Sequence, residues 1–381
     1  MKMIVGVGAA LGVGLLLMSQ TNAPRVRSVN DRAGASVGQC APLERRIDAA
    51  LQRRFDEVVD DAASRGFAGG VAILRDGALI YDRVAGNAAL DGAVPVGATT
   101  LFHVASITKY FTAALVMKAV EEGRLELDDS LGTVLSDAPG TLGPLTLADL
   151  LAHRSGLGSS YRGEQETARA EALSALGEAP PDPERAGRFR YSNDGYDLLG
   201  IVLETVYDRP YERLLAEKIF GPACLEHAAH WAEVDVRDAH VVSQPLRSLG
   251  RQITRRNYGM LSSAGLLITA RDLVRYEHAL EEGDVLSAEA RSVLWTPRDE
   301  MSLGASTYGA FLSERPNVGR VLNARGNEDW GDNAILNHYL DRDVIVAVVT
   351  SRGPAEDSGA PYFRNELSDK IEAILFPEVG P

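Results

Sequence analysis

The chain has 381 residues, of which 45% are hydrophobic and 24% charged. A chain of this length can bury a large core without a metal or disulfide to stabilise it, and by length alone we expect two lobes. Its 39 basic residues are outnumbered by 53 acidic ones, giving a net charge of −14, and lysine and arginine nowhere cluster. Because nucleic-acid binding requires basic surfaces that neutralise phosphates, this composition argues against a nucleic-acid partner.

The first 23 residues predict an export signal. Lys2 precedes an apolar run over residues 3–18, and small and polar residues follow up to Ala23. A charged start, a short apolar core and small residues at the end are typical of a secretory signal peptide. A membrane-spanning helix needs ~20 apolar residues, so an uncleaved segment that attaches the protein transiently to the membrane is the second interpretation. We expect a periplasmic or secreted protein, with residues 24–41 as a flexible lead-in.

The next segments predict a helix and a hairpin. Residues 42–65 carry apolar side chains at helical spacing, which indicates an amphipathic helix. Two β-rich segments, residues 71–74 and 79–84, flank Asp76-Gly77. Because Asp-Gly readily adopts the positive φ angles of a tight turn, this pattern predicts a β-hairpin.

The middle of the chain, about residues 104–295, is predicted to be mostly helical. Helices are expected to start near Ser106, Leu147, Asp194, Pro210, Ala270 and Ser287. Strands are expected around residues 309–312, 320–323, 333–339 and 344–350, before a final helix over about 362–376. We therefore expect an α+β fold with an antiparallel sheet flanked by helices, built from about 42–103 and 296–381, with a helical lobe, about 104–295, inserted. The interface between the lobes is the natural place for a cleft.

Cysteines and paired histidines give no clear site. Cys40 and Cys224 are the only cysteines, and their spacing does not say whether they meet in space. His227 and His230 lie at helical spacing with no cysteine nearby, which favours a surface helix over a metal site. We expect neither a metal nor a cofactor.

Ser106 and Lys109 form a candidate nucleophile pair. They stand three residues apart at the start of a predicted helix, so both side chains face the same side. Serine becomes a good nucleophile when a neighbouring group takes its proton, and a buried lysine amine can do so. The helix N-terminus also offers N–H groups to a developing oxyanion. The alternative is a helix cap followed by a solvated lysine; only five lysines occur in the chain, which makes a chance match less common.

Tyr191 and Asn193 form a second candidate pair, just before the helix expected from Asp194. A tyrosine oxygen aimed at the serine could relay a proton to the leaving group. An asparagine amide can both donate to a substrate carbonyl and accept from a substrate N–H. Judged alone, the pair is equally consistent with a helix cap and a packing tyrosine.

Together these motifs resemble a known family. Ser-x-x-Lys followed by Tyr-x-Asn is the pattern of penicillin-recognising serine hydrolases, which include class C β-lactamases, DD-carboxypeptidases of the same fold, and related esterases and amidases. Further segments similar to that family occur in its order: Phe102-His103-Val104-Ala105, the LLAHRSGL stretch at residues 150–157, Ser262-Ser263-Ala264-Gly265, and Ala270-Arg271-Asp272-Leu273.

The resemblance implies roles for these residues. Ser106 would be acylated, Lys109 would exchange its proton, Tyr191 would relay a proton to the leaving group, and Asn193 would position the substrate. The oxyanion hole would combine the N–H of Ser106 with one from a strand in the C-terminal part. Residues 42–381 would form one β-lactamase-like domain that acts on D-amino-acid peptides, amides or esters.

The family's third motif is altered in this chain. Lys-Thr-Gly or His-x-Gly is usual there, and the equivalent stretch begins Ala324-Arg325-Gly326-Asn327, with Asn327 at the usual glycine position. Arg325 could offer positive charge to a substrate carboxylate. A side chain at Asn327 would crowd the approach of the substrate, and Glu328 adds negative charge. We therefore expect Arg325, Gly326 and Asn327 to line a modified substrate site.

Two other interpretations of the function stay open. One is a β-lactamase, and the other is a non-catalytic binding relative that keeps the fold, as the altered third motif would allow. Ser36 lies in a Gly-x-Ser-x-Gly pattern but lacks the preceding strand that gives the pattern meaning. His103 and His153 are expected to pack in the core or to support the site rather than to form a catalytic triad.

Overall fold

The computed structural model describes residues 40–245, 256–302, 304–353 and 362–377. The predicted signal peptide and the Ser36 pattern lie outside these residues. Within them, no helix combines the length and the apolar character that crossing a membrane requires. The same residues contain no group of three or more histidine, cysteine, aspartate or glutamate side chains that could hold a metal ion.

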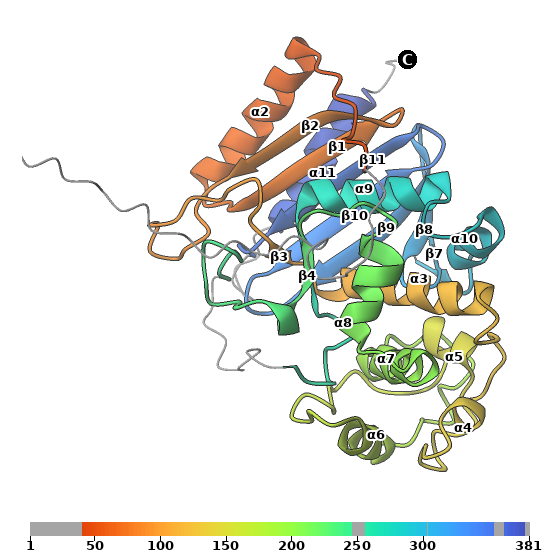
Figure 1. Cartoon of the computed structure of the whole chain (residues 1–381). Helices are drawn as coiled ribbons and strands as arrows, with labels where there is room; N and C mark the ends of the chain where they lie inside the picture. The colour runs from red at the N-terminus through yellow and green to blue at the C-terminus, as the bar shows by residue number, and fades with distance from the viewer. Residues whose placement is uncertain (1–39, 246–255, 303, 354–361, 378–381) are drawn as a thin grey trace, which may run out of the picture.

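A large antiparallel sheet forms the upper part of the molecule in Figure 1. Its strands lie in the order β2-β1-β11-β10-β9-β8-β7-β6, so the N-terminal hairpin joins the C-terminal strands directly. The bounds are β1 Gly69–Arg75, β2 Ala78–Ala85, β6 Glu300–Met301, β7 Gly304–Ser306, β8 Phe311–Arg315, β9 Gly319–Asn327, β10 Asn333–Tyr339 and β11 Val344–Thr350. The predicted antiparallel sheet flanked by helices is therefore confirmed.

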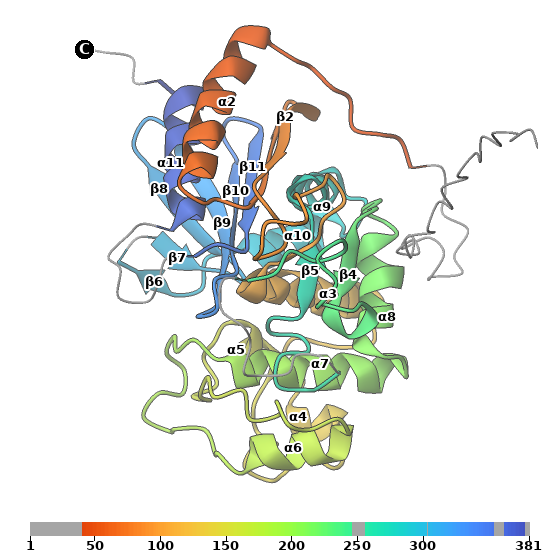
Figure 2. The same ribbon diagram turned by 90° about the vertical axis from the view of Figure 1, so that its left-hand side faces the viewer.

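Helices cover both faces of this sheet. α2 (Ala49–Ser64) and α11 (Phe363–Leu375) lie side by side on one face, and α9 (Ala270–Glu282) lies on the other (Figure 2). Successive residues of β1 point to opposite faces, so Val71 packs in the cluster beneath α2 and α11 while Ala72 packs in the cluster that contains α9. Covering both faces explains why residues 344–349 of β11 are continuously apolar.

The remaining helices form a layer below the sheet. They are α3 Thr108–Glu121, α4 Leu131–Val134, α5 Leu147–Leu151, α6 Arg169–Gly177, α7 Asn193–Tyr207, α8 Tyr211–Leu214 and α10 Ala288–Trp295. α3 is buried along most of its length, and it packs against α7 on one side and α10 on another. α9 lies within residues 104–295, which the sequence assigns to the helical lobe. Because α9 packs on β1 and β11, this part of the chain also contributes to the layer of the large sheet.

A second sheet of three short strands connects the two layers. β3 (Phe102–His103) pairs with β5 (Leu266–Ile268), which pairs with β4 (Ala228–His230). The surface helix predicted for residues 227–230 is therefore wrong. His230 is fully buried, and its Nε2 lies 2.9 Å from the carbonyl oxygen of Leu261, because strand pairing with β5 overrides the helical spacing of the two histidines.

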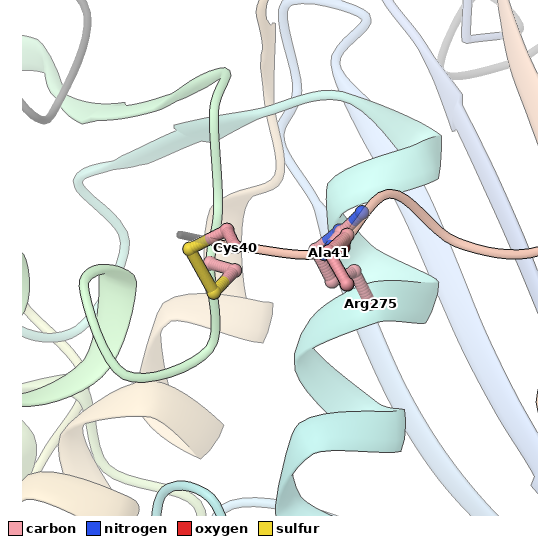
Figure 3. Close-up of a disulfide and its surroundings, with 4 residues drawn as sticks. Cys40, Ala41 and Arg275 are labelled. Atoms are coloured by element: carbon pink, nitrogen blue, oxygen red, sulfur yellow. A yellow bond between two sulfur atoms is a disulfide. The ribbon is translucent and has the colours of Figure 1, made fainter. Parts of the chain in front are cut away.

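A disulfide joins Cys40 to Cys224, across 184 residues of sequence (Figure 3). Next to it, Arg275 of α9 donates a hydrogen bond of 3.1 Å to the carbonyl oxygen of Ala41. The start of the described chain is thus fixed both to α9 and to the segment that follows α8.

Candidate active site

The candidate nucleophile stands on a tight turn between β3 and α3. Ser106 lies in a short 3-10 helix, η1 (Ala105–Ile107), and Ala105 has a φ of 47°, in the left-handed region. The hydroxyl of Thr108 donates to the carbonyl oxygen of Ala105 over 2.7 Å and accepts from the N–H of Leu266 over 3.0 Å. These bonds hold a strained turn that places the partly buried Ser106 at the N-terminal end of α3.

Lys109 is almost entirely buried and faces Ser106. Its Nζ lies 3.2 Å from Ser106 Oγ and donates to the carbonyl oxygen of Ser263 over 2.8 Å. It also lies 4.8 Å from the ring centre of Tyr191 and 5.9 Å from that of Tyr196. Two polar contacts and two aromatic faces therefore fix the amine beside the serine.

Tyr191 approaches the same serine from the helical layer. Its phenol donates to Ser106 Oγ over 2.7 Å. The ring of His153 lies 4.6 Å from the ring of Tyr191, and His153 Nδ1 accepts the N–H of Ser192 over 3.1 Å. Burial, with a smaller contribution from the charge of Lys109, lowers the pKa of His153 to about 3. His153 is therefore a neutral acceptor that holds Tyr191 in place.

Asn193 is the first residue of α7, which Ser192 caps by accepting the N–H of Gly195 over 2.9 Å. The backbone N–H of Asn193 donates to Ser159 Oγ over 3.1 Å. Its side-chain oxygen is buried and has no hydrogen-bond partner among the described residues. A hydrogen bond thus holds the backbone of Asn193, while the oxygen of its side-chain amide accepts no hydrogen bond from the described residues.

The altered third motif lies on an open edge of β9. β8 pairs with β9 only from Gly319 to Asn323, which leaves residues 324–327 without a partner on that side. A Cβ added at Gly326 would lie 1.9 Å from the carbonyl oxygen of Val104, so glycine is required at this position. Asn327, which the motif comparison placed at the glycine position, is exposed. The close approach to the nucleophile turn therefore falls one residue earlier than the sequence suggested.

A cavity opens beside the serine. Its lining residues are Ser106, Lys109, His153, Phe189, Tyr191, Ser306, Thr307, Gly309, Ala310, Phe311 and Arg325. The guanidinium of Arg325 lies 5.3 Å from the ring centre of Phe311, whose ring is 6.5 Å from that of Phe189. Of the predicted residues, Ser106, Lys109, Tyr191 and Arg325 meet in this cavity, and Asn193, Gly326 and Asn327 are not among its lining residues.

Glu328 follows the third motif and is largely buried. Burial raises the pKa of its carboxyl to about 7, although the charges of His103 and Lys109 act in the opposite direction. The negative charge that the sequence predicts at this position is therefore partial near neutral pH.

Sequence reasoning gave no role to Ser263. Its carbonyl oxygen is the backbone acceptor of Lys109, and the carbonyl oxygen of Ala264 beside it lies 2.5 Å from Nε2 of His103 on β3. The Ser-Ser-Ala-Gly segment resembles the family sequence, but the sequence does not show which backbone carbonyl oxygen accepts a hydrogen bond from Lys109.

A serine hydroxyl held by a buried amine and a phenol, at the start of a helix, defines a serine hydrolase of the acyl-transfer type. A protein-family model described as "Beta-lactamase" matches residues 51–368. Because this match covers most of the chain, the protein belongs to the Beta-lactamase family.

Individual proteins support the same assignment. Penicillin-binding protein 4 of Amycolatopsis lactamdurans is 28% identical over 357 residues, which are 86% of this chain and 91% of that protein. PbpX of Bacillus subtilis (strain 168) is 24% identical over 248 residues, 64% of this chain and 63% of PbpX, so the match spans less than two thirds of PbpX. The D-amino acid amidase from Ochrobactrum anthropi SV3, in complex with D-phenylalanine, shares the fold with a TM-score of 0.70 and 19% identity, over 86% of this chain and 99% of the amidase.

Proposed function

We propose that the protein is an exported hydrolase that forms an acyl-enzyme on Ser106 and acts on D-amino-acid peptides, amides or esters. The observation that carries this proposal is the pair of contacts to Ser106 Oγ, 3.2 Å from Lys109 Nζ and 2.7 Å from the phenol of Tyr191. The catalytic domain would comprise residues 42–381.

The reaction begins when Ser106 Oγ attacks the substrate carbonyl carbon and Lys109 Nζ takes the serine proton. The negative charge that develops on the substrate oxygen would be stabilised by the N–H of Ser106 and by an N–H on the open edge of β9. Tyr191 then donates its proton to the leaving amine or alkoxide, and the ammonium of Lys109 returns a proton to Tyr191. A water molecule then attacks the carbonyl carbon of the ester and gives a proton to the pair of Lys109 and Tyr191. The same pair returns a proton to Ser106 Oγ as the bond between Oγ and the acyl carbon breaks, and the carboxylic acid is released.

The walls of the cavity support a substrate with a carboxylate on the leaving-group side. Arg325 can pair with a carboxylate, and stacking on Phe311 holds its guanidinium in position. Asn193 does not line this cavity, and its buried amide oxygen would have to be uncovered before it could accept an N–H from the acyl part of a peptide. The pairing of Arg325 with a carboxylate agrees with a peptide whose terminal residue is released.

Export is supported by the disulfide, because disulfides persist in oxidising compartments such as the periplasm or the extracellular space. We assign residues 1–23 as the signal peptide on the pattern of the sequence alone.

The test is covalent labelling of the purified protein with a fluorescent fluorophosphonate and a fluorescent penicillin, read by intact mass and by the labelled peptide. We expect an adduct on Ser106 that is absent in Ser106→Ala and strongly reduced in Lys109→Ala. Partly exposed Lys118, at the far end of α3, provides the matched control Lys118→Ala, which should label normally. Folded protein that reacts with neither probe would favour a binding role over catalysis. Turnover of a chromogenic cephalosporin would favour β-lactamase activity instead.

A further inference from the structure

His103 is buried beside two tryptophans, close to the nucleophile. It ends β3, three residues before Ser106, and only 6% of its surface is exposed. The rings of Trp231 and Trp330 lie 5.8 and 6.1 Å from its ring, at interplanar angles of 25° and 18°. A cation stacked on an indole face is stabilised by it.

The partners of the ring favour a proton on both nitrogens. Nε2 lies 2.5 Å from the carbonyl oxygen of Ala264, and Nδ1 lies 3.4 Å from the carboxylate of Asp332. A carbonyl oxygen and a carboxylate both accept hydrogen bonds, and neutral imidazole has only one N–H. The geometry is therefore satisfied by the doubly protonated ring, the imidazolium.

These partners belong to segments that carry reacting groups. Ala264 follows Ser263, whose carbonyl oxygen accepts from Lys109. Asp332 lies in the turn between β9 and β10, which begins directly after the open edge of β9, and the indole N–H of Trp330 donates to its carboxylate over 2.8 Å. His103 itself leads into the turn of Ser106. His103 thus contacts the Lys109 acceptor segment and the β9–β10 turn, and it directly precedes the turn of Ser106.

We propose that the His103 imidazolium is a positioning residue, which keeps the nucleophile turn, the Lys109 acceptor segment and the β9 edge in their reactive arrangement only while it is protonated. This inference rests on the proposed function and adds a pH-dependent requirement to it. When His103 loses its proton, Nδ1 presents a lone pair to Asp332, and the contact with the β9–β10 turn becomes repulsive.

Several titratable or charged groups lie around this ring. Asp332 and Glu328 come from the β9–β10 turn, and His230, whose pKa burial lowers to about 4, comes from β4. Lys109 of α3 acts on Glu328, and Arg352, at the end of β11, acts on Asp332. Burial lowers the pKa of His103, but the hydrogen bond and charge of Asp332, with the charge of Glu328, raise it above its usual value. Because Glu328 also titrates near neutral pH, the experiment must change Asp332 and leave Glu328 in place.

The experiment combines histidine NMR with labelling kinetics. In protein carrying ¹³C-labelled histidine, the His103 signal is assigned by its loss in His103→Gln and titrated in the wild type and in Asp332→Asn. Fluorophosphonate labelling rates are measured over the same pH range. Asp341→Asn is the matched control, since Asp341 is an exposed carboxylate on the neighbouring β10–β11 turn.

We expect the midpoint of His103 to lie above pH 6.5 in the wild type and in Asp341→Asn, and to fall by about one unit or more in Asp332→Asn, because the stabilising carboxylate is gone. The alkaline loss of labelling should move to lower pH by the same amount, and His103→Gln should label up to about 100-fold more slowly. The amide signal of Gly326 should titrate with the midpoint of His103.

Two results would overturn the proposal. A midpoint below pH 6.5 in the wild type would show that His103 is neutral, and a Gly326 amide that ignores the titration of His103 would show that no positioning occurs. These NMR readouts do not depend on catalysis. If they behave as expected while no probe labels Ser106 at any pH, the proposed hydrolase activity fails and the charged contact stands.

Discussion

Gly326 and Val104 touch through their backbones, since a Cβ on Gly326 would lie 1.9 Å from the carbonyl oxygen of Val104. Val104 stands two residues before Ser106, so this contact sets the distance between the nucleophile turn and the edge of β9. The absence of a side chain at Gly326 therefore controls the position of any oxyanion donor on that strand.

Gly326→Ala should separate the two segments. We expect the labelling rate of Ser106 to fall by about 100-fold or more, as when an oxyanion donor is lost, and the free energy of unfolding to fall by about 1–3 kcal/mol through overpacking. Labelling kinetics and urea denaturation measure the two effects. Asn327→Ala, at the exposed neighbouring position, should change the free energy of unfolding by less than about 0.5 kcal/mol. Equal effects of both variants would contradict the importance of the contact.

Tyr191→Phe should separate the packing of the Tyr191 ring from proton donation by its hydroxyl. The ring that faces Lys109 and His153 remains, but the hydroxyl that donates to Ser106 is lost. We expect kcat for an amide substrate to fall by about 10²–10⁴-fold with little change in thermal stability, because general acid catalysis is removed and packing is kept. Tyr207→Phe, which removes a phenol that bonds to Glu122 away from the site, is the control. Full activity of Tyr191→Phe would remove the tyrosine from the mechanism.

The disulfide should stabilise the fold without taking part in the reaction. Replacing both Cys40 and Cys224 by serine removes a link across 184 residues, and we expect the free energy of unfolding to fall by about 2–5 kcal/mol. Neither cysteine lines the cavity at Ser106, so labelling at low temperature should persist. Reductant should lower the melting temperature of the wild type and leave that of the double serine variant unchanged. Reductant-insensitive melting of the wild type would show that the link is absent or without effect.

His338 should make stability depend on alkaline pH. Burial lowers the pKa of His338, but Glu277 at 3.0 Å and Glu281 at 3.5 Å raise it to about 9. Because the folded pKa lies above the unfolded value of 6.5, the stabilisation is complete below pH 6.5 and is lost as pH rises through 9. This difference between the folded and unfolded pKa of His338 corresponds to about 3 kcal/mol in the free energy of unfolding.

Urea denaturation at pH 6 and pH 10 measures this effect. His103 contributes in the same direction, so the informative quantity is the difference in pH dependence between the wild type and His338→Gln. We expect His338→Gln to lose about 3 kcal/mol of the pH dependence and the exposed control His240→Gln to lose none. An unchanged pH dependence in His338→Gln would contradict the proposed charge on His338.

Elements with strong local signals could be predicted from the sequence. β10 and β11 have the predicted bounds. β11 is an almost continuous β-branched run, and the turn at residues 341–343 separates it from β10. In the N-terminal hairpin, Asp76 and Gly77 have φ angles of 49° and 67°, as the Asp-Gly turn requires. In the small sheet, β3 was expected from the family resemblance of residues 102–105. β4 and β5 were missed, because segments of three residues become strands only through partners far away in the sequence.

The candidate site shows the same division. Ser106, Lys109 and Tyr191 stand out in the sequence because their side chains are the reactive groups. The acceptor at Ser263 and the glycine requirement at Gly326 arise from backbone atoms that meet only after folding, so no residue pattern reveals them. The partners of His103 come from three separate segments, and its surroundings were likewise beyond the reach of the sequence.

The pairing of β1 with β11 joins residues 69–75 to residues 344–350, so the centre of the sheet closes only when the end of the chain arrives. Such distant pairing slows folding and leaves strand edges unprotected in the meantime. Fragments that stop before residue 344 would expose the apolar edge of β1, and we expect them to aggregate. The edge of β1 that faces β11 is therefore buried only in chains that include residues 344–350.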